Sequence, residues 1–200
     1  YSKEEDMKKS MGTKTMIIPT PVLIVGTYDM SGKPNAMTVA WGGVCCSEPP
    51  CIAIALRKAT YTYGNIMEKK AFTVHVATEP YVKVADYFGI VSGRNVDKFA
   101  VTGLTPVKAE YIDAPCIEEF PLYFECRLLH TIEIGLHNHF IGEIVSTKID
   151  EKVLADDGRP DMKKLQPIGY APEVRDYFNI GTSLGTAFKI GREIVKCRES

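Results

Sequence analysis

Apolar, β-branched segments of strand length recur along this chain without the regular strand–helix alternation of a doubly wound sheet. Turn residues separate them, and only short stretches have helical patterns. A sheet with so many strands exposes its edges unless it closes, so a closed antiparallel barrel is favoured. The sequence therefore predicts a mainly β fold with short helices. Strands are expected at 22–29, 35–42, 51–56, 71–77, 107–112, 122–134 and 138–149. Helices are expected at 61–70 with Thr60 as the cap, at 81–88 and briefly within 92–103.

The first 15 residues are charged and lack periodicity, which predicts a loosely held arm or a short helix. One domain is expected over 16–200, because 200 residues with 45% apolar side chains supply one good-sized core. Within it, 156–160 predicts a turn and the tail from Gly181 predicts irregular structure.

The charge balance and hydropathy argue against two classes of partner. Lys and Arg number 24 and Asp and Glu number 25, so the net charge of −1 does not favour nucleic-acid binding. No apolar run approaches the ~20 residues that a membrane span needs. We therefore expect a cytoplasmic protein that binds neither nucleic acid nor membrane.

The six cysteines have no C-x-x-C spacing, which argues against a zinc ribbon or a thioredoxin-type motif. Reduced thiols are expected, since a chain of this size does not need disulfides. The neighbours Cys45 and Cys46 are either redox active or small buried residues at a strand-to-loop corner. The cysteines are Cys45, Cys46, Cys51, Cys116, Cys126 and Cys197.

The common dinucleotide, nucleotide triphosphate, hydrolase and zinc-protease motifs are missing from the sequence. His137, His139 and Glu143 have the H-x-H-x-x-x-E spacing of the first metal motif of cupins, which suggests a metal-dependent dioxygenase as an alternative. That motif is incomplete, because Thr131 and Asp150 stand where cupins have glycines and no histidine follows His139. Histidines on a half-exposed strand face are the favoured explanation, and no metal site is predicted.

A candidate anion site follows the expected strand 51–56. Arg57 and Lys58 end the strand, and Thr60 and Thr62 supply hydroxyls where a helix begins with free backbone N–H groups. This combination suits a phosphate monoester, although an ordinary capped helix with two solvated cations has the same pattern. Because clustered carboxylates for Mg²⁺ are missing nearby, a phosphorylated cofactor is favoured over phosphoryl transfer.

A second segment mixes small residues with amide and hydroxyl groups beside the only tryptophan. Small side chains let a flat ring approach the backbone, whose N–H groups can bond its polar edge. A plain core strand with a turn at its start is the alternative. The segment is Asn35, Ala36, Met37, Thr38, Val39, Ala40 and Trp41.

Together these segments resemble the flavin reductase-like family, the FMN-binding split barrels. The resemblance covers roughly 25–190 and is most specific in 26–66 (GTYDMSGKPNAMTVAWGGVCCSEPPCIAIALRKATYTYGNI), with further likeness in 85–104 (ADYFGIVSGRNVDKFAVTGL) and 128–144 (LLHTIEIGLHNHFIGEI). It implies a homodimer of FMN-binding split β-barrels with the flavin near the dimer interface. The implied function is an NAD(P)H-dependent flavin or ferric reductase, or an electron-transfer flavoprotein served by a redox protein.

The resemblance also implies roles for individual residues. His137 matches the family's Gly-x-His position beside the flavin and the nicotinamide, but Leu136 stands where the family has Asp, so both electron donors remain alternatives. The residues implied to hold FMN are Asn35 to Trp41 with Cys46 and Ser47 at the ring, Arg57, Lys58, Thr60 and Thr62 at the phosphate, and Ser92, Gly93 and Asp97 in the facing loop.

Overall fold

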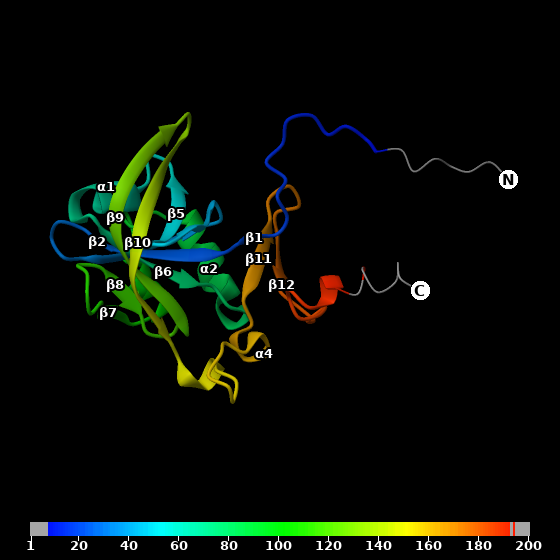
Figure 1. The fold of residues 1–200 in the computed structure, drawn as a ribbon. Helices are drawn as coiled ribbons and strands as arrows, with labels where there is room; N and C mark the ends of the chain where they lie inside the picture. Colours follow the sequence, from blue (N-terminus) through cyan, green and yellow to red (C-terminus); the bar gives the residue numbers. More distant parts are fainter. Residues whose placement is uncertain (1–7, 193, 195–200) are drawn as a thin grey trace.

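The computed structural model describes residues 8–192 and residue 194, and most of its strands form one seven-stranded antiparallel sheet. The sheet curls around a core, with strand order β3-β2-β6-β9-β10-β5-β4 (Figure 1). The prediction of a mainly β fold is confirmed. The strands are β2 (Leu23–Tyr28), β3 (Pro34–Val39), β4 (Gly42–Ser47), β5 (Pro50–Leu56), β6 (Ala71–Val76), β9 (Leu122–Ile134) and β10 (His137–Ile149).

The barrel is split rather than closed by hydrogen bonds. β3 and β4 are consecutive in the chain but lie at opposite ends of the strand order, and within the described residues no ladder joins them. Between them the carbonyl oxygen of Trp41 accepts a bond of 2.8 Å from the Ala55 N–H. The chain therefore turns toward β5 instead of forming a β3–β4 hairpin, which corrects the expectation of a fully closed barrel.

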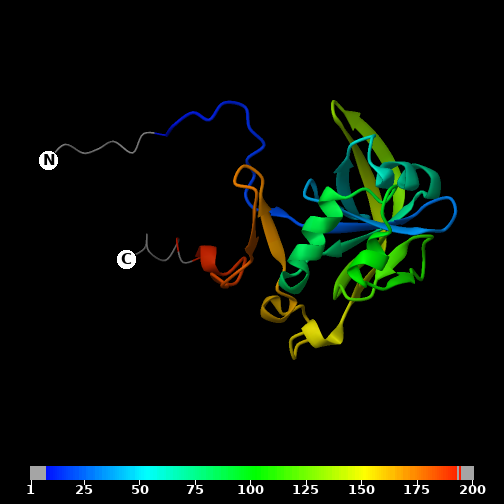
Figure 2. The ribbon, with the colours of Figure 1, turned by 180° about the vertical axis from the view of Figure 1, so that it is seen from behind.

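Short helices and two small sheets surround the barrel. Figure 2 shows the barrel from behind, with α2 running along it. The expected helices after β5 and β6 and the helical turn within 92–103 are confirmed. The helices are α1 (Tyr61–Lys69), α2 (Val82–Ile90), α3 (Lys98–Thr102) and α4 (Met162–Leu165), with 3-10 turns η1 (Glu79–Tyr81), η2 (Glu151–Val153) and η3 (Ile190–Arg192).

The remaining strands form two small sheets beside the barrel. β1 (Thr20–Pro21), β11 (Ile168–Ala171) and β12 (Asp176–Asn179) form one sheet, and β7 (Pro106–Lys108) pairs with β8 (Pro115–Ile117). β1 and the β11–β12 hairpin therefore lie together on one side of the barrel (Figures 1 and 2).

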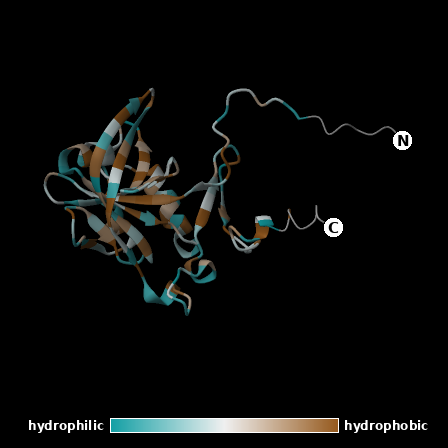
Figure 3. Ribbon diagram, in the orientation of Figure 1, coloured by the Kyte–Doolittle hydropathy of each residue, from teal (hydrophilic) through white to brown (hydrophobic). Residues whose placement is uncertain are grey.

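β2 separates two hydrophobic cores, which explains its nearly continuous apolar sequence. Leu23 and Val25 face the barrel interior, whereas Val22 and Ile24 pack in the core that includes Phe88 of α2. Alternate residues of a strand point to opposite faces, so both faces of β2 are buried here. Figure 3 shows the hydrophobic segments along the barrel strands.

The expected strand 107–112 is shorter than predicted. β7 ends at Lys108, and the Ala109 N–H bonds to the Ala114 carbonyl oxygen. The buried carboxylate of Glu125 accepts from the backbone N–H of Glu110 at 3.4 Å and of Tyr111 at 2.8 Å. This side chain takes the place of a ladder partner, so the backbone turns instead of extending.

Several expectations concern the cysteines and the chain ends. Cys45 and Cys46 lie exposed on edge strand β4, not buried at a corner. Residues 8–15 contain no helix. Residues 181–186 are irregular as predicted, but the tail then contains η3. Residues 1–7 and Cys197 lie outside the described residues. No helix in the described part of the chain is long and apolar enough to cross a membrane.

Candidate functional site

The candidate anion site lies where β5 ends and α1 begins. Thr60 is the N-cap of α1, accepting from the Tyr63 N–H at 3.3 Å and donating to the Arg57 carbonyl oxygen at 2.9 Å. The first N–H groups of the nine-residue helix remain available, as at any helix N-terminus. With the Arg57 side chain beside them, these donors form a site that attracts an anion.

A buried pair of polar side chains connects β3 to this helix start. The Asn35 amide nitrogen donates to the Thr62 hydroxyl oxygen at 3.0 Å, and both residues are buried. The Asn35 Oδ1 atom is buried and has no hydrogen-bond partner among the described residues. A buried amide oxygen without a partner costs free energy, so Asn35 is suited to accept from a bound molecule.

The loop after α2 closes over Asn35. A Cβ atom added at Gly93 would lie 2.0 Å from Asn35 Oδ1, so only glycine fits this approach. The next residue, Arg94, donates to the Ala59 carbonyl oxygen at 2.7 Å and lies over the Tyr61 ring. These contacts fix the loop against the start of α1.

A buried lysine completes this wall. Lys98 follows Asp97, the N-cap of α3, and is only 4% exposed. Its Nζ donates to the carbonyl oxygens of Ala36 at 2.7 Å and Phe88 at 2.8 Å. Burial lowers the pKa of Lys98 to about 8. An ammonium group has three N–H donors, so one remains for a bound acceptor.

These groups surround a cavity of about 260 Å³. It combines an unpartnered acceptor, two cationic side chains, hydroxyl groups and a helix N-terminus, which together suit a phosphorylated molecule with polar hydroxyl or N–H groups. Seven residues singled out in the sequence line it, namely Asn35, Met37, Arg57, Thr60, Thr62, Ser92 and Gly93, together with Tyr61 and Lys98.

The expected flat slot along 35–41 is divided between the two faces of β3. Asn35 and Met37 line the 260 Å³ cavity, whereas Thr38 and Ala40 line a neighbouring cavity of about 340 Å³ between α2 and β11. Ala36 and Val39 pack in the two cores. Because strand side chains alternate, the two faces of the segment border different cavities, and its end at Ala40 and Trp41 borders a third.

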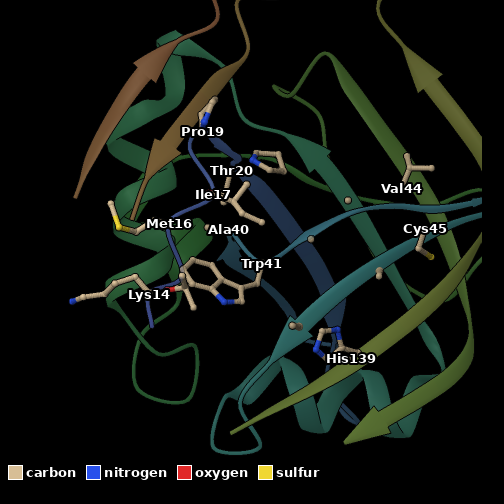
Figure 4. Close-up of a pocket in the computed structure, with 16 residues that line it drawn as sticks. Lys14, Met16, Ile17, Pro19, Thr20, Ala40, Trp41, Val44, Cys45 and His139 are labelled. Atoms are coloured by element: carbon tan, nitrogen blue, oxygen red, sulfur yellow. The ribbon is translucent and has the colours of Figure 1, made fainter. Parts of the chain in front are cut away.

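A third and larger cavity, of about 670 Å³, lies beside Trp41. The N-terminal segment, β4, β5 and His139 of β10 line it. Figure 4 shows the Trp41 indole next to Met16 and Ile17, with His139 on the opposite wall. The lining is mainly apolar, so this space suits an apolar or aromatic molecule.

His137 of β10 lies close enough to Arg57 to interact with its charge, but the β10 histidines do not form a metal centre. Burial, the Arg57 guanidinium and His139 lower the pKa of His137. Glu143 is bonded instead to Arg127 of β9 at 2.7 Å. Among residues 8–192 and 194, no group of three His, Cys, Asp or Glu side chains can hold a metal. The cupin-like alternative with His137, His139 and Glu143 is therefore wrong.

Four other residues that the sequence predicted to hold FMN do not line the 260 Å³ cavity. Lys58 is exposed and paired with Glu133 at 2.8 Å, and Asp97 caps α3 through a bond of 3.1 Å to the Ala100 N–H. Cys46 and Ser47 are exposed at the β4–β5 turn. Their contact with a cofactor stays a prediction.

Lys98 and Arg94 were not predicted from the sequence as parts of the site. Both cations belong to the segment 92–98, from which only Ser92, Gly93 and Asp97 were selected. The available signal was an N-cap Asp directly before a lysine, but only the packing of α3 against β3 and α2 shows that this lysine is buried.

A family model and a curated relative match this chain. The model of the flavin reductase like domain matches residues 15–172. A high molecular weight rubredoxin of Moorella thermoacetica is 32% identical over 141 residues, which are 70% of this chain and 60% of that protein.

Solved structures show the same fold. Flavoredoxin of Desulfovibrio vulgaris (Miyazaki F) is 52% identical, covers 92% of this chain and 100% of its own, and superposes with a TM-score of 0.89. Flavoredoxin from Methanosarcina acetivorans is 30% identical, covers 94% of this chain and 100% of its own, and has a TM-score of 0.86.

Proposed function

Because the chain belongs to the flavin reductase-like family, as its sequence resemblance predicted, we propose that it is an FMN-binding oxidoreductase. The observation that carries this proposal is the 260 Å³ cavity, where an anion site and the unpartnered Asn35 Oδ1 lie together. FMN carries the phosphate that the anion site requires. It also carries hydroxyl and N–H donors, one of which can bond to Asn35 Oδ1. The flavoredoxin structures, similar over their full length, support FMN as the flavin.

Each part of the cavity then has a defined task. Arg57 and the N-terminal N–H groups of α1 bind the phosphate, and Asn35 accepts from a donor of the cofactor. Lys98 places a positive charge between β3 and α2, where it would stabilise negative charge on a bound flavin. When bound, FMN supplies the one- and two-electron chemistry, and the protein sets its affinity, potential and access.

We propose a redox protein as the electron donor in preference to NAD(P)H. Leu136 stands where the family has an acidic residue before His137, and the sequence has no dinucleotide fingerprint. The relatives named flavoredoxin and high molecular weight rubredoxin support an electron carrier. The protein then acts as an electron-transfer flavoprotein, and direct reduction by NAD(P)H is the competing outcome.

We also propose a homodimer, with the apolar end of the β9–β10 hairpin in the interface. Ile134 and Leu136 at this end are 59% and 63% exposed. Exposed apolar side chains that gather on one projecting element indicate a protein contact. Sedimentation velocity should give a species of twice 22.2 kDa, and Ile134→Glu should shift it to the single-chain mass.

The proposed function is tested by the visible spectrum of the protein after incubation with FMN and removal of the excess. Retention of the flavin absorption bands at one equivalent supports the proposal, and a colourless protein contradicts it. Rapid bleaching by a reduced low-potential iron–sulfur protein, with slow bleaching by NADH and NADPH, identifies the carrier. Rapid bleaching by either nicotinamide would instead identify a reductase.

A further inference from the structure

Two cysteines face each other across the β4–β5 hairpin. The register pairs Ser47 with Pro50 and, one step further, Cys46 with Cys51. Directly opposed residues of antiparallel strands have Cα atoms about 4.5 or 5.5 Å apart, depending on the pair type. Disulfides span Cα separations of about 4.4 to 6.8 Å. The backbone therefore already holds Cys46 and Cys51 at a distance that a disulfide bridges.

The two thiols differ in accessibility. Cys46 is exposed, and its thiol donates to the Glu48 carbonyl oxygen at 3.3 Å. Cys51 is only 3% exposed, and burial raises the pKa of its thiol, with further increases from the thiols of Cys46 and Cys45. One thiol is thus open to a reagent in solution, and the other is placed to react only with its neighbour.

The sequence neighbour Cys45 is less suited to pair with Cys46. The β4 register shifts between Val44 and Cys46, so Cys45 is the extra residue of a bulge and has no partner of its own on β5. The structure thus favours a cross-strand pair over the vicinal pair of adjacent cysteines.

We propose that Cys46 and Cys51 form a thiol–disulfide redox site that exchanges electrons with low-molecular-weight disulfides. This activity goes beyond the proposed flavin function, because the pair lies at the β4–β5 turn, and neither residue lines the 260 Å³ cavity. Cys45 and Ala53, close to them in sequence, line the 670 Å³ cavity beside Trp41, so the pair lies next to that cavity.

The reaction balances in two steps. The Cys46 thiolate attacks one sulfur of the disulfide co-reactant, forms a mixed disulfide and releases the other half as a thiolate. The Cys51 thiolate then attacks the Cys46 sulfur, closes the Cys46–Cys51 disulfide and releases the second half. The protein loses two electrons and two protons, and the co-reactant disulfide becomes two thiols. An excess of dithiol reverses the sequence.

Differential alkylation of the full chain tests the proposal, with oxidised glutathione as the probe. After equilibration and acid quenching, free thiols are blocked with iodoacetamide under denaturing conditions. The remaining disulfides are reduced and labelled with N-ethylmaleimide, and the labels are located by mass spectrometry. We expect labels on Cys46 and Cys51 together, rising and falling as one two-electron transition when the ratio of oxidised to reduced glutathione is varied.

Matched variants identify the partner thiol. Cys45→Ser should retain labelling of the pair, whereas Cys51→Ala lacks the second sulfur, cannot close the disulfide and should leave glutathione attached to Cys46. Wild-type labels on Cys45 and Cys46 would overturn the proposal. So would a glutathione adduct on wild-type Cys46 that never resolves. Because wild-type protein alone decides these outcomes, a folding defect in Cys51→Ala does not affect the test.

Discussion

The Asn35 side-chain nitrogen and the Thr62 hydroxyl oxygen lie 3.0 Å apart, and this hydrogen bond joins β3 to the start of α1. The side-chain oxygen of Asn35, Oδ1, has no hydrogen-bond partner among the described residues. Elsewhere, Asn65 makes the same type of bond to Thr27, also at 3.0 Å. Asn35 borders the 260 Å³ cavity, whereas Asn65 does not line it. The two pairs are therefore alike in structure and differ in exposure to a ligand.

Asn35→Ala should lower FMN affinity about three- to tenfold, because it removes one acceptor for the cofactor and the orientation of Thr62. Titration of flavin fluorescence measures the change. Asn65→Ala is the matched control. It should lower the unfolding free energy about as much as Asn35→Ala does, while FMN affinity stays the same. Equal affinity of the Asn35→Ala variant and the wild type would contradict the role of Asn35.

Arg57→Ala should weaken FMN binding roughly ten- to a hundredfold, since a charge-assisted contact contributes about 1.5 to 3 kcal/mol. Lys58 is the adjacent control, because its ammonium is exposed and paired with Glu133 outside the cavity. Isothermal titration should therefore show a clearly smaller loss for Lys58→Ala. If both variants lose the same affinity, general charge attraction rather than a local Arg57 contact holds the phosphate.

His137→Ala should retain FMN but slow its reduction by the low-potential iron–sulfur protein proposed above as the donor. The pKa of His137 is lowered, mainly by burial, so the imidazole is neutral at pH 7.5 and can exchange a proton with a bound group. Stopped-flow absorbance should show a rate about a hundredfold lower, typical of the loss of a proton-transfer residue. The exposed His130 supplies the control variant, and an unchanged rate in His137→Ala would identify His137 as structural.

Lys98 should make the flavin-free protein more stable as the pH rises from about 8 toward 10.5. Burial lowers its pKa to about 8 in the folded state, so the unfolded chain binds more protons in this interval. The unfolding free energy then increases with pH by on the order of 1–3 kcal/mol. Urea titrations of the wild type and of Lys98→Met across this pH range should isolate the increase that Lys98 causes. Parallel pH profiles of unfolding free energy for the wild type and Lys98→Met would refute the prediction.

His75 should make the protein sensitive to acid between pH 6.5 and about 4. Its ring is fully buried, hydrogen-bonded to the Ile24 carbonyl oxygen at 3.1 Å and to the Ile117 N–H at 2.9 Å. Burial lowers its pKa to about 4, so stability is fully present above pH 6.5 and is lost as the pH falls.

The expected loss is about 3 kcal/mol. Urea unfolding across this interval measures it, and His75→Gln, which can retain hydrogen bonds without titrating there, should flatten the profile. A wild-type stability that stays constant from pH 6.5 to 4 would show that His75 does not titrate in this range.

The sequence alone determined the mainly β fold, the positions of most strands, the α1 cap at Thr60 and the family. These features depend on local properties, namely alternation, turn residues and a capping hydroxyl, which neighbouring residues encode. The segments β3 and 57–62 were also selected from composition alone, because amides, cations and hydroxyls are uncommon beside buried strands.

Only the tertiary structure decided which of these residues meet. It placed Lys98 under β3, paired Lys58 with a distant strand, left Asn35 Oδ1 without a partner and set Cys46 opposite Cys51. It also separated Glu143 from the histidines by bonding it to Arg127. Each of these outcomes depends on strand register and on the packing of helices against the barrel, and such contacts between distant segments are not encoded in any local pattern.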